Sequence, residues 1–130
     1  MLDFTNSAIF KLKEVADERI DSSIEPLLID GEKVVSSYKA LRDFVVFTNK
    51  RIIAVNVQGI TGSKKDFTSL PYSKIQAYSI ETAGAAESFI GIGGDCELEV
   101  CFSGLGIARF EFKYDSNIMK ICKVISEYVL

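Results

Sequence analysis

Histidine is absent from this chain of 130 residues. Without it, the chain cannot build a Ser-His or Cys-His nucleophile pair, a histidine-containing metal site or an imidazole pH switch. Long apolar stretches are also missing, since the longest uninterrupted runs, Phe44 to Phe47 and Ile52 to Val55, hold four residues each. A helix that crosses a membrane needs about 20 apolar residues. These absences argue against a histidine-dependent enzyme and against a membrane-spanning helix.

Cysteine is scarce and charge is nearly balanced. Cys96, Cys101 and Cys122 form neither a C-x-x-C pair nor an even set that would indicate a disulfide framework. The first residues carry no basic segment and no small-residue cleavage site, so we expect reduced thiols and a cytoplasmic location. The net charge is -3, from 15 basic and 18 acidic residues. This balance argues against a general nucleic-acid binder.

What is present suits one globular domain. Hydrophobic residues make up 48% and charged residues 25% of the chain, which is ordinary for a folded protein. The glycine-rich stretch from Gly91 to Gly94 lacks the lysine and the serine or threonine that end a phosphate-binding loop. We therefore expect turn glycines there and no cofactor. The longer loop from Gly84 to Gly94 is the expected place for a partner contact.

Hydrophobic periodicity predicts a helix near each end of the chain. The first spans residues 7–20, where apolar residues recur at three- or four-residue steps at Ile9, Leu12, Ala16 and Ile20. A short helical turn is expected between Ser22 and Leu28. The last helix runs from Asn117 to Val129, and its apolar stripe should face the core. That stripe consists of Ile118, Ile121, Cys122, Ile125, Tyr128 and Val129.

Between these helices the period changes to two, which predicts strands. The expected strands are Lys33–Leu41, Phe44–Phe47, Arg51–Val57, Lys64–Leu70, Ile75–Thr82, Cys96–Phe102 and Ala108–Tyr114. The last two should form a hairpin whose solvent face carries Glu97, Glu99 and the most reactive thiol, Cys101, with Arg109 or Lys113 as a cross-strand partner. The prediction is an α+β fold, a bent antiparallel barrel or sandwich of about seven strands capped by the last helix. Residues 1–28 would be a helical extension, and residues 29–130 the main domain.

Two stretches carry a family resemblance. The first is Arg-Asp-Phe-Val-Val-Phe-Thr-Asn-Lys-Arg-Ile-Ile at 42–53, and the second is Gly-Ile-Thr-Gly-Ser-Lys-Lys at 59–65, followed by Leu-Pro-Tyr-Ser-Lys-Ile at 70–75. In order and spacing they resemble the bacterial pleckstrin-homology-like domains, over most of the chain from residue 28 onward. The resemblance implies a pleckstrin-homology-like fold without a known catalytic residue. It also implies assembly into closed cyclic homo-oligomers, with pentameric rings expected.

The strand from Arg51 to Val57 is apolar on both faces. Ile53, Val55 and Val57 point away from the face that Ile52 and Ala54 share. A strand with one solvated face should alternate apolar and polar residues, so something must cover the second face. Either the N-terminal helix covers it within one chain, or a neighbouring subunit does so in a ring. In the second case Ile53, Val55 and Val57 are subunit-interface residues.

Basic residues in or beside the turns of the first strands suggest an anion site. Lys39 and Arg42 flank the first hairpin, and Lys64 and Lys65 could lie across from it. Eukaryotic pleckstrin-homology domains that bind phosphoinositides have basic residues around this hairpin. Phosphate binding requires several converging cationic donors. Arg42 has a competing interpretation as an internal ion pair with Asp43.

The sequence therefore supports two functions. The first is a non-catalytic binding or scaffolding module, a ring-shaped homo-oligomer that presents its loops to a protein partner. The alternative is a domain that binds anionic lipid or phosphate at the inner membrane surface through Lys39, Arg42, Lys64 and Lys65. Neither predicted helix has the lysine-rich and arginine-rich polar face of an interfacial membrane anchor. We identify no catalytic residue and no metal ligand set, and we expect no nucleic-acid partner.

Overall fold

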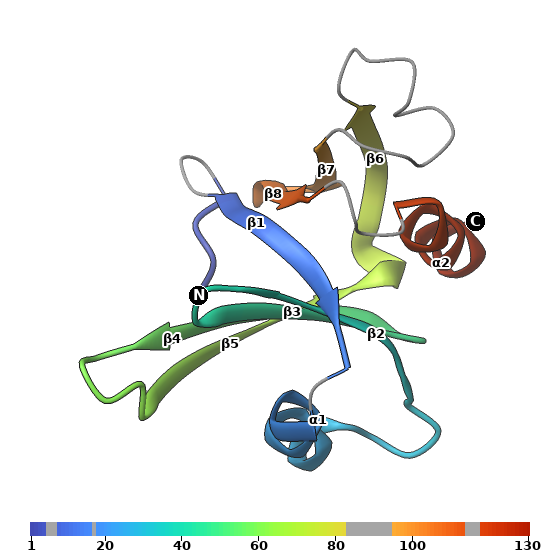
Figure 1. The fold of residues 1–130 in the computed structure, drawn as a ribbon. Coiled ribbons are helices and arrows are strands. Elements are labelled where there is room, and N and C mark those ends of the chain that lie inside the picture. The colour runs from blue at the N-terminus through green and yellow to red at the C-terminus, as the bar shows by residue number, and fades with distance from the viewer. Residues whose placement is uncertain (5–7, 17, 83–94, 114–117) are drawn as a thin grey trace.

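A computed structural model describes residues 1–4, 8–16, 18–82, 95–113 and 118–130 (Figure 1). The strands are β1 (Ala8–Val15), β2 (Val34–Ala40), β3 (Asp43–Thr48), β4 (Arg51–Gln58), β5 (Lys64–Pro71), β6 (Ile75–Thr82), β7 (Cys96–Phe102) and β8 (Gly106–Phe112). The helices are α1 (Glu18–Ile24) and α2 (Ile118–Val129), with short 3-10 turns η1 (Glu25–Leu27) and η2 (Tyr72–Lys74). In Figure 1, α1 lies on one side of strands β2 to β5, and α2 lies on the other side with β6, β7 and β8.

The described strands form one open mixed sheet of 8 strands in the order β5-β4-β3-β2-β1-β8-β7-β6. Neighbours pair antiparallel except for β1 and β8, which pair parallel. The prediction of a seven-stranded, wholly antiparallel sheet is therefore wrong in its strand count and in the direction of one pair. The sheet is not closed, because β5 and β6 are its two edges. The strands predicted from Lys33 onward are present, with small shifts at their ends.

The predicted helix over residues 7–20 is wrong for most of its length. Residues 8–15 form β1, which fills the gap between β2 and β8 and is thus part of the sheet rather than of a helical extension. An N-terminal helix is present, but it is α1, from Glu18 to Ile24. Within β1 the register against β8 shifts between Ile9 and Leu12, and Lys11 has a φ of 62° in this irregularity. Such a bulge breaks the alternation by which strands are identified from sequence.

The main core fills the space between the two halves of the sheet and α2. Ile121 and Ile125 of α2 are fully buried there, as predicted for the centre of the apolar stripe. Tyr128 of that stripe is instead 39% exposed, and Val124, which lies outside the predicted stripe, is buried. The Tyr38 ring lies edge-on to Phe47 and Phe112, with centroid separations of 5.6 and 5.1 Å. Aromatic side chains of this size bury large apolar areas and favour such edge-to-face contacts. They link β2 and β3 to β8 across the core.

A second, smaller core lies on the opposite face of β3 and β4. Its buried members are Ile20, Ile24, Phe44, Val46, Ile53 and Val55. The first two belong to α1, so an N-terminal helix covers the second apolar face within a single chain, which is one of the two predicted alternatives. Half-buried Val57 and Leu28 pack against the rim of this cluster. Since α1 is short and has no strong intrinsic tendency to form alone, this packing is what stabilises it.

Candidate functional site

A hollow of about 300 Å³ opens between α1 and the turns that follow β2 and β4. Its lining residues are Arg19, Ile20, Ser23, Lys39, Leu41, Arg42, Phe44, Val57, Gly62 and Lys65. The apolar members continue the second core to the surface, and all four charged members are basic. We refer to this site as the cationic hollow. Four converging positive side chains above an apolar floor form a suitable site for an anion.

Three of the four predicted anion-binding residues meet at the cationic hollow. Lys39 comes from β2, Arg42 from the turn after it, and Lys65 from β5. Lys64 is not among the described residues that line it, because successive side chains of a strand point to opposite faces. Lys64 remains exposed at the same end of β5. The anion-binding role of all four residues stays a prediction.

Hydrogen bonds position the basic groups of the cationic hollow. The Arg42 guanidinium donates from Nη1 to the carbonyl oxygen of Gly59 at 2.5 Å, which ties the β2–β3 turn to the β4–β5 turn. Lys65 donates from Nζ to Ser23 Oγ at 3.1 Å, which ties β5 to α1. Each group keeps further N–H donors, since lysine has three and arginine five. The contacts therefore orient the cations and leave donors available for an anion.

Sequence reasoning missed the two other polar side chains that line the cationic hollow, those of Arg19 and Ser23. Both lie on α1, whereas the predicted N-terminal helix, over residues 7–20, lies mostly before this segment. Because the helix was predicted too early in the chain, the sequence did not indicate that residues 18–24 fold back over β3 and β4. A usable signal was present in Ile20 and Ile24, which are four residues apart and can bury one face of a short helix.

The suggested ion pair between Arg42 and Asp43 is not formed. Arg42 instead bonds to the backbone of Gly59. The Asp43 carboxylate accepts a hydrogen bond from the backbone N–H of Val57 at 2.9 Å and one from the Asn56 amide at 3.4 Å. Neighbouring residues at a strand end project in different directions, which separates the two side chains. The guanidinium of Arg42 is therefore not neutralised by the adjacent aspartate.

A buried ion pair at the opposite end of β4 supports the same strands. The Glu32 side chain is fully buried and receives Arg51 Nε at 2.9 Å and Nη2 at 3.0 Å, with Thr48 Oγ1 at 2.7 Å. Burial alone would raise the pKa of Glu32. The hydrogen bonds from Arg51, Thr48 and the Ile29 backbone, with the arginine charge, outweigh it and lower the pKa below its ordinary 4.5. This bidentate pair is structural and lies away from the cationic hollow.

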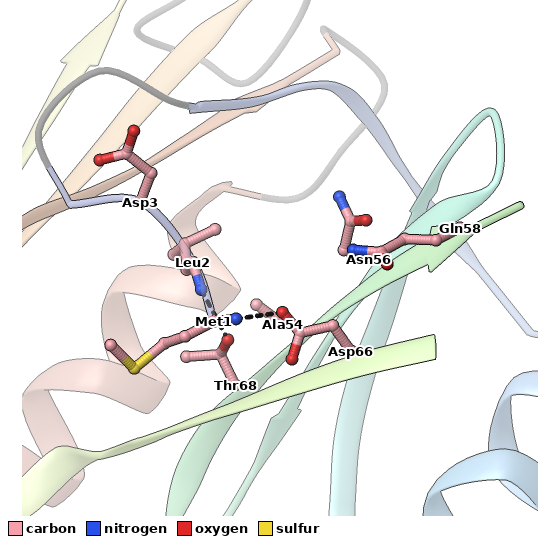
Figure 2. Close-up of a pocket in the computed structure, with 8 residues that line it drawn as sticks. All are labelled: Met1, Leu2, Asp3, Ala54, Asn56, Gln58, Asp66 and Thr68. Atoms are coloured by element: carbon pink, nitrogen blue, oxygen red, sulfur yellow. Dashed lines mark hydrogen bonds and ion pairs between the residues drawn. The ribbon is translucent and has the colours of Figure 1, made fainter. Parts of the chain in front are cut away.

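A second hollow of about 230 Å³ opens on the other face of β4 and β5 (Figure 2). It is lined by Met1, Leu2, Asp3, Ala54, Asn56, Gln58, Asp66 and Thr68. The Met1 amino group pairs with the Asp66 carboxylate, and the Leu2 N–H donates to Thr68 Oγ1 at 2.9 Å (Figure 2). Both charged side chains of its lining are acidic. A phosphate-bearing ligand is therefore better matched by the cationic hollow.

The solvent face of the β7–β8 hairpin agrees with its predicted pattern. Glu99 pairs with Arg109 at 3.4 Å across the hairpin, which confirms one of the two expected partners. Cys101 lies half-buried on this face, whereas Cys96 is buried. Burial raises the pKa of the Cys96 thiol and also that of Cys122. Both thiols are therefore ionised less often than an ordinary cysteine, and the expectation that Cys101 reacts first stays a prediction.

The other predicted positions concern assembly and partners. Ile53 and Val55 are buried beneath α1, while half-buried Val57 lines the cationic hollow. A subunit contact over this face would thus meet the outer surface of α1 unless that helix moves. The predicted partner loop, Gly84 to Gly94, lies outside the described residues. The subunit interface stays a prediction.

Neither helix in the described part of the chain has the length and apolar character needed to span a bilayer.

The chain matches the family described as bacterial PH domain over residues 3–129. The chain is 35% identical over 127 residues to the uncharacterized protein YjqA of Bacillus subtilis, covering 96% of this chain and 97% of that protein. It is also 27% identical over 121 residues to YozO of the same organism, covering 93% and 96%.

Two solved structures of proteins with a pleckstrin-homology domain are also similar to this chain. A DUF1696 family protein with a pleckstrin-homology domain from Shewanella loihica superimposes with a TM-score of 0.76 at 31% identity, covering 93% of this chain and 99% of that one. A pleckstrin-homology domain from Shewanella amazonensis gives 0.65 at 33% identity, covering 96% and 93%. The described fold is thus pleckstrin-homology-like, with a mixed sheet of 8 strands, an N-terminal helix and a C-terminal helix. The chain belongs to the bacterial pleckstrin-homology domain family.

Proposed function

We propose that this domain is a non-catalytic binding module that captures a phosphate-bearing anion in the cationic hollow. The observation that carries the proposal is the convergence of Arg19, Lys39, Arg42 and Lys65 around one hollow of about 300 Å³. These residues come from α1, β2, the β2–β3 turn and β5, so only the folded chain brings them together. A phosphate group accepts hydrogen bonds from several such donors at once.

The partial exposure of the cations sets the expected strength of binding. Arg19, Arg42 and Lys65 are exposed and Lys39 is half-buried, so solvent and salt screen their charges. Affinity should therefore be modest and should fall as ionic strength rises. Arginine adds geometric preference, since its planar fork matches two phosphate oxygens.

Lys65→Glu is expected to weaken the binding of inorganic pyrophosphate by at least about tenfold, because it removes one cation and adds a repelling charge. Isothermal titration calorimetry at low salt measures this change. Lys123→Glu is the matched control, since Lys123 is an exposed lysine on α2 and the change in net charge is the same. Equal weakening by the two variants would contradict a localised site and indicate a response to net charge alone.

A second candidate function is a scaffolding ring that presents its loops to a protein partner. The observation that favours it is the open sheet, since β5 and β6 are edge strands in the described part of the chain. An unpaired edge offers backbone donors and acceptors to another chain. A head-to-tail contact that closes by rotation gives a ring.

The ring predicts a mass of five copies of 14.4 kDa, about 72 kDa, unchanged between low and high salt. Multi-angle light scattering measures it directly. Phe67→Lys places a charge on edge strand β5, at a side chain that is 37% exposed, and should reduce the mass to that of one chain. A wild-type mass of 14.4 kDa at both salt concentrations contradicts the ring.

A further inference from the structure

The two edge strands of the sheet differ in how they are protected against pairing with another chain. Edge strands of soluble proteins commonly carry lysine or proline, which discourage the addition of a further strand. Strand β5 has both, with Lys64 and Lys65 at its start and Pro71 at its end. Strand β6 (Figure 1) contains neither in Ile75–Thr82, and its one charged residue is Glu81. Of the two edges, β6 is therefore the one whose sequence permits an added strand.

The backbone of β6 is regular enough to receive such a strand. From Ala77 to Thr82 it pairs residue for residue with Cys101 to Cys96 of β7, and its one register shift lies before this stretch, between Ile75 and Ala77. Within the described part of the chain, no strand pairs with its other side. Alternate residues of an edge strand direct their backbone N–H and C=O groups outward. This side of β6 therefore offers a row of donors and acceptors to another chain.

Acidic side chains cross the solvent face of the sheet next to this edge. Glu81 of β6 lies opposite Glu97 of β7, which in turn lies opposite Glu111 of β8. One carboxylate oxygen from each of Glu81, Glu97 and Glu99 lies within 4.8 Å of the other two. We refer to these four glutamates as the acidic row. Like charges directly opposite each other destabilise a sheet. Among the described residues, Arg109 forms the only ion pair with the acidic row, through Glu99 at 3.4 Å, so this face attracts positive charge from outside.

An apolar hollow of about 150 Å³ lies on the same face, nearer the start of β6. Its lining residues are Ala77, Tyr78, Ser79, Glu99, Cys101 and Ile107. Along β6 the side chains of this face are Ala77, Ser79 and Glu81, because every second residue of a strand points to the same side. A strand that lies beside β6 would therefore place its own alternate side chains over the hollow and over the acidic row.

We propose that the outer edge of β6 binds an extended peptide segment of another protein, with basic side chains on the acidic row and an aliphatic side chain in the apolar hollow. Backbone hydrogen bonds add the segment as a strand, and its alternate side chains supply the selectivity. The acidic row repels nucleic acids and anionic membranes, so a basic protein segment is the occupant that it selects. The inference goes beyond the proposed function, because this site shares no residue with the cationic hollow.

The test is a titration of the dye-labelled peptide Thr-Arg-Thr-Arg-Thr-Val-Thr with the full chain, followed by fluorescence anisotropy. One control peptide has glutamate in place of both arginines, and the other, Thr-Thr-Arg-Arg-Val-Thr-Thr, has the same composition without the alternation. The alternating peptide should bind at least about tenfold more tightly than either control. Its valine should also cover the half-buried thiol of Cys101 and slow the reaction of that thiol with N-ethylmaleimide, measured by mass spectrometry.

Glu81→Gln combined with Glu97→Gln removes two charges of the acidic row at nearly unchanged shape. It should weaken binding of the alternating peptide by at least about tenfold. The thermal midpoint should not fall, because the change relieves repulsion between opposite like charges, and pyrophosphate affinity should stay the same. The matched control is Glu25→Gln combined with Glu127→Gln, two exposed glutamates on η1 and α2. This control should bind the peptide as wild type does.

Three results would overturn the proposal. Equal binding of the alternating and the rearranged peptide would exclude strand addition and indicate attraction to net charge alone. Wild-type affinity in the Glu81 and Glu97 variant would exclude recognition by the acidic row. A wild-type chain that binds none of the three peptides would leave β6 without a peptide function, and a light-scattering mass that is a multiple of 14.4 kDa would then indicate a second copy at this edge. Pyrophosphate binding is measured separately, so the proposed function stands or fails independently of these results.

Discussion

Val55→Asp is expected to leave the domain largely unfolded. Val55 is fully buried between β4 and α1, in the cluster that also contains Ile24 and Phe44. A carboxylate there would lose its hydration without gaining a partner, a change of more than about 4 kcal/mol. Domains of this size have a total stability of only about 5–15 kcal/mol. Ile53→Asp should act in the same way, since Ile53 is 1% exposed in the same cluster.

Urea unfolding followed by circular dichroism measures the loss. The matched control is Ile60→Asp, because Ile60 lies in the turn that follows the same strand but is 104% exposed. The control should change the free energy of unfolding by at most about 0.5 kcal/mol. A folded Val55→Asp variant with a wild-type unfolding midpoint would contradict the covering of this face by α1. A variant that folds but loses a wild-type oligomer would instead support a subunit interface at this position.

Arg51→Leu is expected to lower the free energy of unfolding by about 3–5 kcal/mol near neutral pH. It leaves the Glu32 carboxylate fully buried, with hydrogen bonds only from Thr48 and from the backbone of Ile29. It also removes the donors that Arg51 supplies to Ser69 and to the carbonyl of Leu27. An uncompensated buried charge is the cause of the large effect.

The matched control is Arg109→Leu, which breaks the ion pair with Glu99 on the surface of the β7–β8 hairpin. Both side chains of that pair are about one third exposed, at 31% and 30%. Its loss should cost at most about 1 kcal/mol. Equal destabilisation by the two variants would contradict the structural role of the buried pair.

The pH dependence of stability provides an independent test of the buried pair. The pKa of Glu32 is lowered below its ordinary 4.5 in the folded state. The pair therefore contributes its stability above about pH 4.5 and loses it as the pH falls through the lower folded pKa. In Arg51→Leu the carboxyl can be buried in its neutral form at acid pH. The difference between wild type and variant should thus shrink below about pH 4.5, and a difference independent of pH would contradict this explanation.

Sequence pattern predicts the second half of the fold well. In β7 and β8 one face meets the core and the other meets water, so apolar and polar residues alternate without interruption. The stripe on α2 is equally clear, because one side of the helix packs on the core. The apolar run in β4 also revealed that both faces of this strand are covered. Sequence pattern could not tell whether a helix of the same chain or a neighbouring subunit covers the second face, because that depends on tertiary packing.

The N-terminal segment shows where sequence pattern fails. The spacing of the apolar residues Ile9, Leu12 and Ala16 fits a helix. The segment instead forms a strand, because there it pairs with both β2 and β8 and completes the sheet between them. The bulge at Lys11 interrupts the alternation that would have indicated it. At the candidate site, the basic residues beside the turns were found from the sequence. Arg19 and Ser23 were missed because their contribution depends on α1 folding back over the sheet.

The measurement that tests the central claim most directly is a titration of the nitrogen-labelled domain with pyrophosphate, followed by amide NMR shifts. We expect the largest shifts at residues that surround the cationic hollow, namely Ser23, Lys39, Arg42, Gly62 and Lys65. These residues are far apart in sequence, so a joint response would locate one site. Shifts that are absent, or spread evenly over exposed lysines such as Lys74 and Lys123, would contradict an anion-binding role for the cationic hollow.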